Sequence, residues 1–298
     1  MNTTRLIIDG NNVIFGAFYA KTSALSASPA EINDHAVIHQ FLLMLKHKVN
    51  MFKPDEIVLT WDERLNHGGP NFRKEAVAYK EQRIETDQTR AIFRIIEKLK
   101  PFIKSLGIKT ILPYNLEADD VIAYVCALDD AYNVIVSSDK DLLQLVSVKV
   151  NVFSTSKKML ITPDNFEEVI GIAKDLYLLQ KAIVGDTSDN IDGLKTYGPI
   201  KSKKLAIELT TKGWDILTEE QKQKIDRNLH IMDLSKGYPL EQDKYEEQYN
   251  QEVDFDSNEF EALCKLFKFN NFCREIGGWV KLFNTKNTTT DLLSRLSM

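Results

Sequence analysis

Short apolar runs rich in Ile and Val alternate along this chain with longer segments in which apolar residues recur at helical spacing. The short runs predict buried strands, and they lie at residues 6–8, 57–61, 108–112, 134–136 and 150–153. Residues 33–52 and 86–105, and the stretch that follows Glu117, have the helical spacing and predict amphipathic helices. Strands and helices that alternate in this way are typical of a mostly parallel central sheet flanked by helices. The pattern therefore predicts an α/β fold.

The pattern changes after Phe153, and from Trp214 onward the chain has only helix and loop signals. Gly193 and Gly198 bracket a short turn, and Pro199 is well placed as the first residue of a helix. We therefore divide the chain into an α/β domain, residues 1–184, and a smaller all-helical C-terminal region, residues 185–298.

The formal net charge of −5 at first argues against a nucleic-acid partner. The distribution of charge argues otherwise. Residues 64–109 carry eleven basic and five acidic side chains, and residues 195–213 carry five basic and one acidic. Two basic segments beside an acidic centre suit a metal-dependent phosphodiesterase. The alternative is that these lysines and arginines simply coat exposed helices, and a charge run alone does not separate the two readings.

Cysteine usage and the N-terminus indicate the cellular setting. Cys126, Cys264 and Cys273 are too few and too scattered for a disulfide framework, and no Cys or His spacing suggests zinc. The expected setting is a reducing cytoplasm. The N-terminus has no export pattern, and the apolar run 6–8 is far too short to span a bilayer, so no membrane association is expected.

Acidic residues follow the predicted strands or begin the predicted helices. They are Asp9, Asp62, Glu117, Asp119, Asp120, Asp139, Asp141, Asp186 and Asp189. The ends of parallel strands meet at one edge of the sheet, where open α/β folds place their sites. Carboxylates crowded there repel one another by about 4 kcal/mol per close pair, which is large beside a total folding stability of about 5–15 kcal/mol. The cluster therefore predicts bound cations, and oxygen-only ligands suit Mg²⁺ or Mn²⁺.

Each acidic motif alone has an ordinary structural explanation. An Asp-Gly pair such as residues 9–10 is a common turn, and acids such as Glu117 and Asp120 favour helix N-termini through the macrodipole. Five acidic motifs in order, each at a strand end or a helix start, are poorly explained in this way. We interpret the set as a metal-binding carboxylate cluster.

The ordered motifs resemble those of the structure-specific 5′ nuclease family. That family includes flap endonucleases, the 5′-nuclease domain of bacterial DNA polymerase I, and tailed-phage 5′ nucleases including phage ribonuclease H. The matching segments are 8–12 (IDGNN), 61–62 (WD), 79–83 (YKEQR), 117–120 (EADD), 138–141 (SDKD), 185–191 (GDTSDNI) and 193–198 (GLKTYG). They cover about residues 5–210, roughly two thirds of the chain. The small size, without a polymerase domain, is most similar to the phage enzymes.

The resemblance implies a PIN-like nuclease domain with two Mg²⁺ ions, for which Mn²⁺ could substitute. Asp9, Asp62, Glu117, Asp119 and Asp120 would form the first metal site, some of them through water. Asp139, Asp141, Asp186 and Asp189 would form the second site. Two such ions activate water and stabilise the leaving oxygen, and none of the five histidines lies in a motif.

The resemblance also implies a helical arch over the active site, at about residues 64–105. Lys80 and Arg83, which would share one helical face, are the expected catalytic residues that hold the scissile phosphate. Arg73 and Lys74 are further candidates for nucleic-acid contacts, and Tyr79 could stack on a base.

Residues 185–212 resemble a helix-hairpin-helix DNA-binding unit. Lys195, Lys201, Lys203 and Lys204 would contact the backbone without sequence preference. In the family a K⁺ ion often sits on hairpin carbonyls, here those of Gly193, Thr196 and Gly198. This chain departs from the usual hairpin, because Thr196-Tyr197 replaces a position that is often glycine and Pro199 replaces a charged residue.

The function that the resemblance implies is a divalent-metal-dependent 5′→3′ exonuclease and 5′-flap endonuclease. Its substrates would be branched, nicked or flapped DNA and RNA–DNA hybrids, and it would remove RNA primers in replication. It would be a phage-encoded monomer acting in a bacterial cytoplasm, with a single-strand-binding protein or a sliding clamp as possible replication partners. A non-specific single-strand ribonuclease on the same fold is the alternative, and a non-catalytic binding protein for branched DNA is another.

Overall fold

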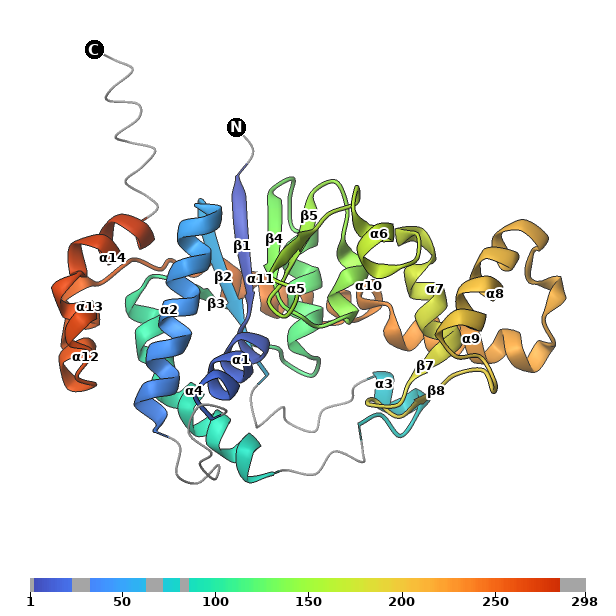
Figure 1. The fold of residues 1–298 in the computed structure, drawn as a ribbon, viewed down its shortest axis with the longest axis horizontal. Helices are drawn as coiled ribbons and strands as arrows, with labels where there is room; N and C mark the ends of the chain where they lie inside the picture. Colours follow the sequence, from blue (N-terminus) through green and yellow to red (C-terminus); the bar gives the residue numbers. More distant parts are fainter. Residues whose placement is uncertain (1–2, 23–32, 63–71, 81–85, 285–298) are drawn as a thin grey trace, which may run out of the picture.

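The computed structural model describes residues 3–22, 33–62, 72–80 and 86–284. Its centre is a six-stranded sheet in the order β3-β2-β1-β4-β5-β6 (Figure 1). The strands are β1 Thr4–Asp9, β2 Glu56–Thr60, β3 Lys109–Thr110, β4 Tyr132–Val136, β5 Val150–Ser154 and β6 Met159–Ile161. All neighbours pair in parallel except β5 and β6. The predicted strands are confirmed, whereas β6 was missed because three residues are too few to show a period.

Alternation along the central strand explains why both faces of the sheet are covered. Leu6 and Ile8 of β1 belong to one apolar core and Ile7 belongs to another, because successive side chains of a strand point to opposite faces. The first core is closed by α1 Gly10–Thr22, α2 Asp34–Phe52, α4 Asp87–Ser105 and the C-terminal helices α12 Ser257–Leu266, α13 Asn270–Arg274 and α14 Ile276–Phe283. The second core is closed mainly by α5 Ala118–Ala127, α10 Leu234–Gly237 and α11 Gln242–Tyr249. The layered α/β prediction is confirmed (Figure 1).

The two long helices begin where their sequences provide caps. The Asn33 side chain accepts a hydrogen bond from the backbone N–H of His35 at the start of α2, and Thr86 accepts one from Thr89 at the start of α4. Such caps satisfy backbone donors that the first turn leaves unpaired. Both helices agree with the predicted ranges to within a residue or two. Pro101 lies inside α4, which continues through it to Ser105.

A smaller helical lobe lies beside the sheet and has its own core (Figure 1). It consists of α7 Lys174–Val184, the short hairpin of β7 Gly185–Asp186 and β8 Ile191–Asp192, α8 Pro199–Lys212 and α9 Glu219–Met232. The buried Asn228 amide of α9 donates hydrogen bonds to the carbonyls of Ala182 and Asp192 and so joins helix and hairpin. A Cβ at Gly193 would lie 1.9 Å from the Val184 oxygen, so the chain can pass there only without a side chain. As predicted, Pro199 is the first residue of its helix.

The C-terminal helices do not stay in this lobe. Phe260, Phe272 and Trp279, from α12 to α14, are buried in the core that also contains Leu6 and Ile8 of the central strand. The C-terminal part of the chain therefore completes one face of the sheet. The division at residues 184 and 185 remains a prediction. Among the described residues, no helix combines the length and the apolar character needed to cross a membrane.

Candidate metal centre

The candidate site lies where the strand order reverses. After β1 the chain forms β2 and β3 on one side and then crosses to form β4 and β5 on the other, and such a switch point leaves a crevice at the carboxyl ends of the strands. A cavity of about 330 Å³ lies there. Eight of the nine predicted acids line it: Asp9, Asp62, Glu117, Asp119, Asp139, Asp141, Asp186 and Asp189.

Asp9 ends β1 and is buried. The Ser137 hydroxyl donates to one carboxylate oxygen at 2.6 Å, and the Asn12 backbone N–H donates to the other at 3.0 Å. Burial raises the pKa of Asp9 to about 6; these hydrogen bonds oppose the rise, and the charges of Asp139 and Asp62 add to it. The fold thus holds this carboxylate in an environment that favours a neighbouring cation.

Asp62 is fixed from two sides. The Ala118 backbone N–H at the start of α5 donates to its carboxylate at 2.8 Å, and the Asn11 amide donates to the other oxygen at 3.2 Å. Asn12 supports the loop that follows β4 in the same way, because its side-chain oxygen accepts a hydrogen bond from the Ser138 backbone N–H at 3.0 Å. The two asparagines belong to the 9–12 motif, but their role as supports was missed because it depends on contacts between distant loops.

Asp119, Asp139 and Asp141 form the tightest group, with one carboxylate oxygen from each lying within 4.8 Å of the others. Burial raises the pKa of Asp119 well above its usual value, and the charges of Asp139 and Asp9 raise it further. Partial burial and the charge of Asp141 also raise the pKa of Asp139, whose side chain is at the exposed mouth of the cavity. Repulsion of this kind is relieved by a cation among the oxygens.

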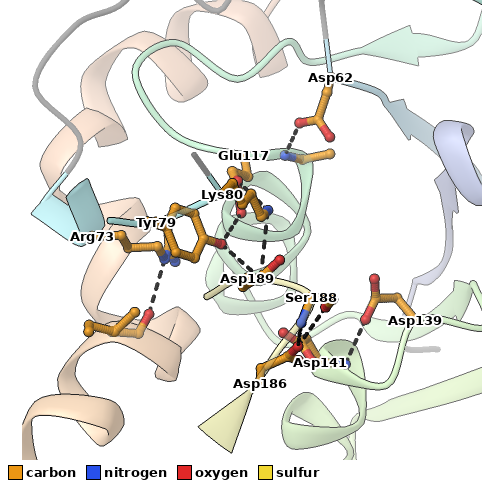
Figure 2. A network of polar contacts seen from close by, with 12 residues as sticks. Asp62, Arg73, Tyr79, Lys80, Glu117, Asp139, Asp141, Asp186, Ser188 and Asp189 are labelled. Carbon is orange, nitrogen blue, oxygen red and sulfur yellow. Dashed lines mark hydrogen bonds and ion pairs between the residues drawn. The ribbon is translucent and has the colours of Figure 1, made fainter. Parts of the chain in front are cut away.

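Two lysine ammonium groups lie among these carboxylates. Lys80 forms an ion pair with Glu117, and its Nζ is 3.8 Å from Asp189 Oδ2 (Figure 2). Lys181 of α7 forms an ion pair with Asp141, and its Nζ is 3.9 Å from Asp186 Oδ2. The donor set is entirely oxygen, and it already attracts positive charge at two places. The residues therefore fit a pair of hard divalent cations.

Lys181 was missed from the sequence. It lies in the amphipathic helix α7, where a lysine has an ordinary role as a solvated residue, and only the packing of that helix brings it to the acidic loop. The sequence signal for Lys181 was its closeness to Asp186, because α7 ends directly before β7 and so places Lys181 in the last helical turn before the acidic loop.

Glu117 has the opposite electrostatic environment from Asp9. Burial alone would raise its pKa, but the charges of Lys80 and Arg73 and hydrogen bonds from Lys80 and Tyr79 outweigh burial and lower the pKa of Glu117. The Tyr79 hydroxyl lies 2.8 Å from Glu117 Oε2 and 3.2 Å from Asp189 Oδ2, and Figure 2 shows it pointing between them.

The predicted ligand Asp120 is not at the cavity. Its side chain is fully buried, and Arg73 donates two hydrogen bonds to its two oxygens at 2.7 and 2.8 Å. Asp120 also accepts from the backbone N–H of Glu117 at 3.1 Å. The structure therefore does not bring Asp120 to the cavity with the other predicted ligands of the first metal site, because Arg73 binds both of its carboxylate oxygens.

Two predicted nucleic-acid contacts belong to the same network. Arg73 is 3% exposed and Tyr79 is 6% exposed, and both line the cavity with their polar groups bonded to its acidic residues or to Asp120. Their contact with a nucleic acid remains a prediction. Lys80 lies in a turn with a φ of 56°, after the short helix α3 Phe72–Ala76. The prediction that Lys80 lies on a helix is therefore wrong. Lys74 is exposed, and its role remains a prediction. Arg83, with residues 63–71 of the predicted arch, lies outside the described residues.

The hairpin lysines lie away from the acidic cavity, at the start of α8. Lys195, Lys201 and Lys204 are exposed, whereas Lys203 is half-buried and donates to the Gly171 carbonyl. Thr196 has a φ of 69°, a left-handed conformation that usually favours glycine. The predicted turn therefore exists without glycine at this position, and the K⁺ site is not tested.

The switch-point cavity, its carboxylates and the adjoining helical lobe define a PIN-like α/β class with an acidic, cation-attracting site. Residues 4–171 match the family described as "5'-3' exonuclease, N-terminal resolvase-like domain". Because the match covers more than half of the chain, the protein belongs to this 5′ nuclease family.

Two proteins with similar sequences are consistent with membership of this family. The chain is 33% identical over 213 residues to DNA polymerase I of Streptococcus pneumoniae, a match that covers 68% of this chain and 24% of that protein. It is 29% identical over 253 residues to the 5'-3' exonuclease of Bacillus subtilis, covering 79% and 82% of the two. The chain thus spans about a quarter of the polymerase relatives.

Solved structures share the fold. The phage T5 5'-exonuclease with bound zinc has a TM-score of 0.61 at 20% identity, covering 89% of this chain and 98% of that one. The phage T5 flap endonuclease in a complex with DNA and metal ions has a TM-score of 0.60 at 19% identity, covering 89% and 99%. At these identities the likeness shows the architecture alone.

Proposed function

We propose that this protein is a divalent-metal-dependent 5′→3′ exonuclease and 5′-flap endonuclease, a phosphodiester hydrolase acting on branched or nicked DNA and RNA–DNA hybrids. The observation that carries the proposal is the convergence of eight carboxylates on one cavity together with Lys80 and Lys181. Family membership supports it, as do relatives named 5'-3' exonucleases and a T5 relative named a flap endonuclease with DNA and metal ions.

The carboxylates divide between two places for cations. Asp9, Asp62, Glu117 and Asp119 would hold the first, and Asp139, Asp141, Asp186 and Asp189 would hold the second. The chemistry that such ions supply when bound is activation of a water molecule and neutralisation of charge on the phosphate. Mg²⁺ is the proposed ion, with Mn²⁺ as a substitute, because hard oxygen ligands suit both.

The chain's own groups hold the metal-binding carboxylates in place and would contact the substrate. Ser137, Asn11 and the Ala118 N–H keep Asp9 and Asp62 in place, so these carboxylates need little reorganisation during the reaction. Glu117 and Asp141 would serve as metal ligands, and Lys80 and Lys181, which now pair with them, would then donate to the oxygens of the scissile phosphate. Lys80 lines the cavity and Lys181 contacts Asp141 in its wall, and the polar walls suit a phosphodiester rather than an apolar ligand.

The helix-hairpin-helix lobe supports a nucleic-acid substrate with a duplex part. Lys195, Lys201 and Lys204 are exposed beside one helix start, where lysines bind phosphates without reading sequence. Primer removal, ribonuclease H activity, a phage origin, a hairpin K⁺ and replication partners go with this proposal as predictions. A single-strand ribonuclease would have less use for such a lobe.

A cleavage assay tests the proposal. Wild type with Mg²⁺ should cut a labelled 5′-flap substrate faster than the matched single strand or free RNA, and EDTA should stop the reaction. Asp139→Asn should abolish cleavage and leave binding of the flap intact. No product with either Mg²⁺ or Mn²⁺ would refute the proposal, and faster cutting of free RNA would favour the ribonuclease.

A further inference from the structure

A buried ion pair lies directly behind the metal centre. The Arg73 guanidinium of α3 donates to both oxygens of Asp120 in the first turn of α5, and its Nε donates to the Ile231 carbonyl of α9 at 3.0 Å. The two side chains are 3% and 0% exposed. One arginine therefore joins three elements that are far apart in the sequence. Figure 2 shows the Arg73 side chain reaching the α9 backbone on one side of the Tyr79 ring.

The space on the Asp120 side of the pair is closed. A Cβ at Gly237 in α10 would lie 2.0 Å from Asp120 Oδ1, so the helix backbone packs against the carboxylate itself. Asp120 also caps its own helix through the Glu117 N–H. A water molecule or a cation has no room on this side of the carboxylate. The geometry suits a fixed anchor better than an exchangeable ligand.

From Arg73 the chain leads within a few residues to the cavity. Asn190 donates to the Ala78 carbonyl at 2.8 Å, and the Lys80 backbone N–H donates to the Asp189 carbonyl at 3.2 Å. The Lys80 backbone has a left-handed φ of 56°, a conformation that the surrounding contacts must hold. The position of the Lys80 ammonium group thus depends on where α3 is fixed.

We propose that Arg73 and Asp120 are a positioning pair, which holds α3 against α5 and α9 so that Lys80 points into the carboxylate cavity. The inference rests on the proposed function, because it takes Lys80 as a residue that contacts the scissile phosphate. It also gives Asp120 a role different from that of its neighbour Asp119. Neither member of the pair touches the reacting atoms.

The experiment uses single-turnover cleavage of the flap substrate at a series of Mg²⁺ concentrations. Arg73→Gln/Asp120→Asn keeps hydrogen-bonding groups in the pocket without charge, and we expect it to lower the maximal rate by about 10- to 100-fold. The half-saturating Mg²⁺ concentration should stay at the wild-type value. Arg5→Gln/Asp129→Asn is the control for the loss of an arginine pair far from the cavity and should cleave like wild type. It removes the ion pairs that the buried Arg5 forms with the half-exposed Asp129 and with Glu56 at the other end of β1.

A second substitution separates positioning from a general loss of stability. Lys80→Ala should lower the rate strongly in the wild-type background and add little in the Arg73→Gln/Asp120→Asn background, because residues that act as a unit are not additive. If that double variant does not fold, Arg73→Lys, which keeps the charge and loses the paired geometry, replaces it with the same expected pattern.

The outcomes are distinct. Additive effects of Lys80→Ala, or an equal loss in the Arg5→Gln/Asp129→Asn control, would overturn the positioning pair. A raised Mg²⁺ requirement with rescue at high Mg²⁺ would overturn it as well, by making Asp120 a ligand. Wild type without any metal-dependent cleavage would instead refute the proposed function.

Discussion

The crowded carboxylates lead to a prediction about stability that is independent of activity. Asp139 has oxygens within 4.8 Å of both Asp119 and Asp141. At an effective dielectric of about 20, each such pair is repulsive by about 3 kcal/mol. Asp139 is exposed at the cavity mouth and Lys181 offsets part of the repulsion, so solvent and counter-charge reduce the sum substantially. We therefore expect Asp139→Asn to stabilise the metal-free protein by about 1–2 kcal/mol.

The stability advantage of Asp139→Asn over wild type should become smaller when metal is added. A ligand that binds only the folded state stabilises it by about 2.7 kcal/mol at a hundredfold excess over its Kd. Wild type should gain more from Mg²⁺ than Asp139→Asn, because the variant has lost one of the charges that hold the ion. The same substitution would thus stabilise the protein in EDTA and reduce the stabilisation that Mg²⁺ provides.

Urea denaturation followed by tryptophan fluorescence measures both effects, in EDTA and in excess Mg²⁺ at constant ionic strength. Asp130→Asn is the control, because that exposed side chain pairs only at the surface with Lys149 and its loss should change stability little. An Asp139→Asn variant that is less stable than wild type in EDTA would refute the reasoning, since it would mean that the carboxylates do not repel one another in the folded state.

Three further predictions concern other parts of the molecule. Arg5 Nε lies 2.6 Å from Glu56 Oε2, and its hydrogen bonds and charge outweigh the burial that would raise the pKa of Glu56, so that pKa is lowered. Glu56→Gln should therefore lower the free energy of unfolding by about 3 kcal/mol at pH 7. This difference from wild type should persist above the ordinary pKa of 4.5 and disappear as pH falls through the lowered pKa of Glu56. Urea denaturation at several pH values would measure it. Gly193→Ala should destabilise the protein by about 1–3 kcal/mol, because its Cβ would meet the Val184 oxygen, and an unchanged melting temperature would contradict this. Lys201→Ala should weaken duplex binding at low salt and reduce the slope of log K against log salt by about 1, whereas an unchanged slope would remove this lysine from the interface.

The sequence was sufficient for the layered fold and for most of the site. The strand runs are short, rich in Ile and Val and buried on both faces, so their length and composition identify them without tertiary information. Because β1 and β4 are parallel neighbours, acids at their ends had to meet, and Asp9 and Asp139 do line one cavity. The parallel arrangement predicted from the sequence places all strand ends at one edge of the sheet, and the structure adds that β1 and β4 are neighbours.

Tertiary structure decided the roles of neighbouring residues. Asp119 and Asp120 are adjacent in the first turn of α5, and no sequence pattern separates their roles. Successive helical residues point about 100° apart, so one side chain enters the cavity and the other meets Arg73. Which of the two faces the cavity depends on how the whole helix is rotated against the sheet and against α9 and α10. That rotation is set by packing between segments more than a hundred residues apart, which no local pattern records.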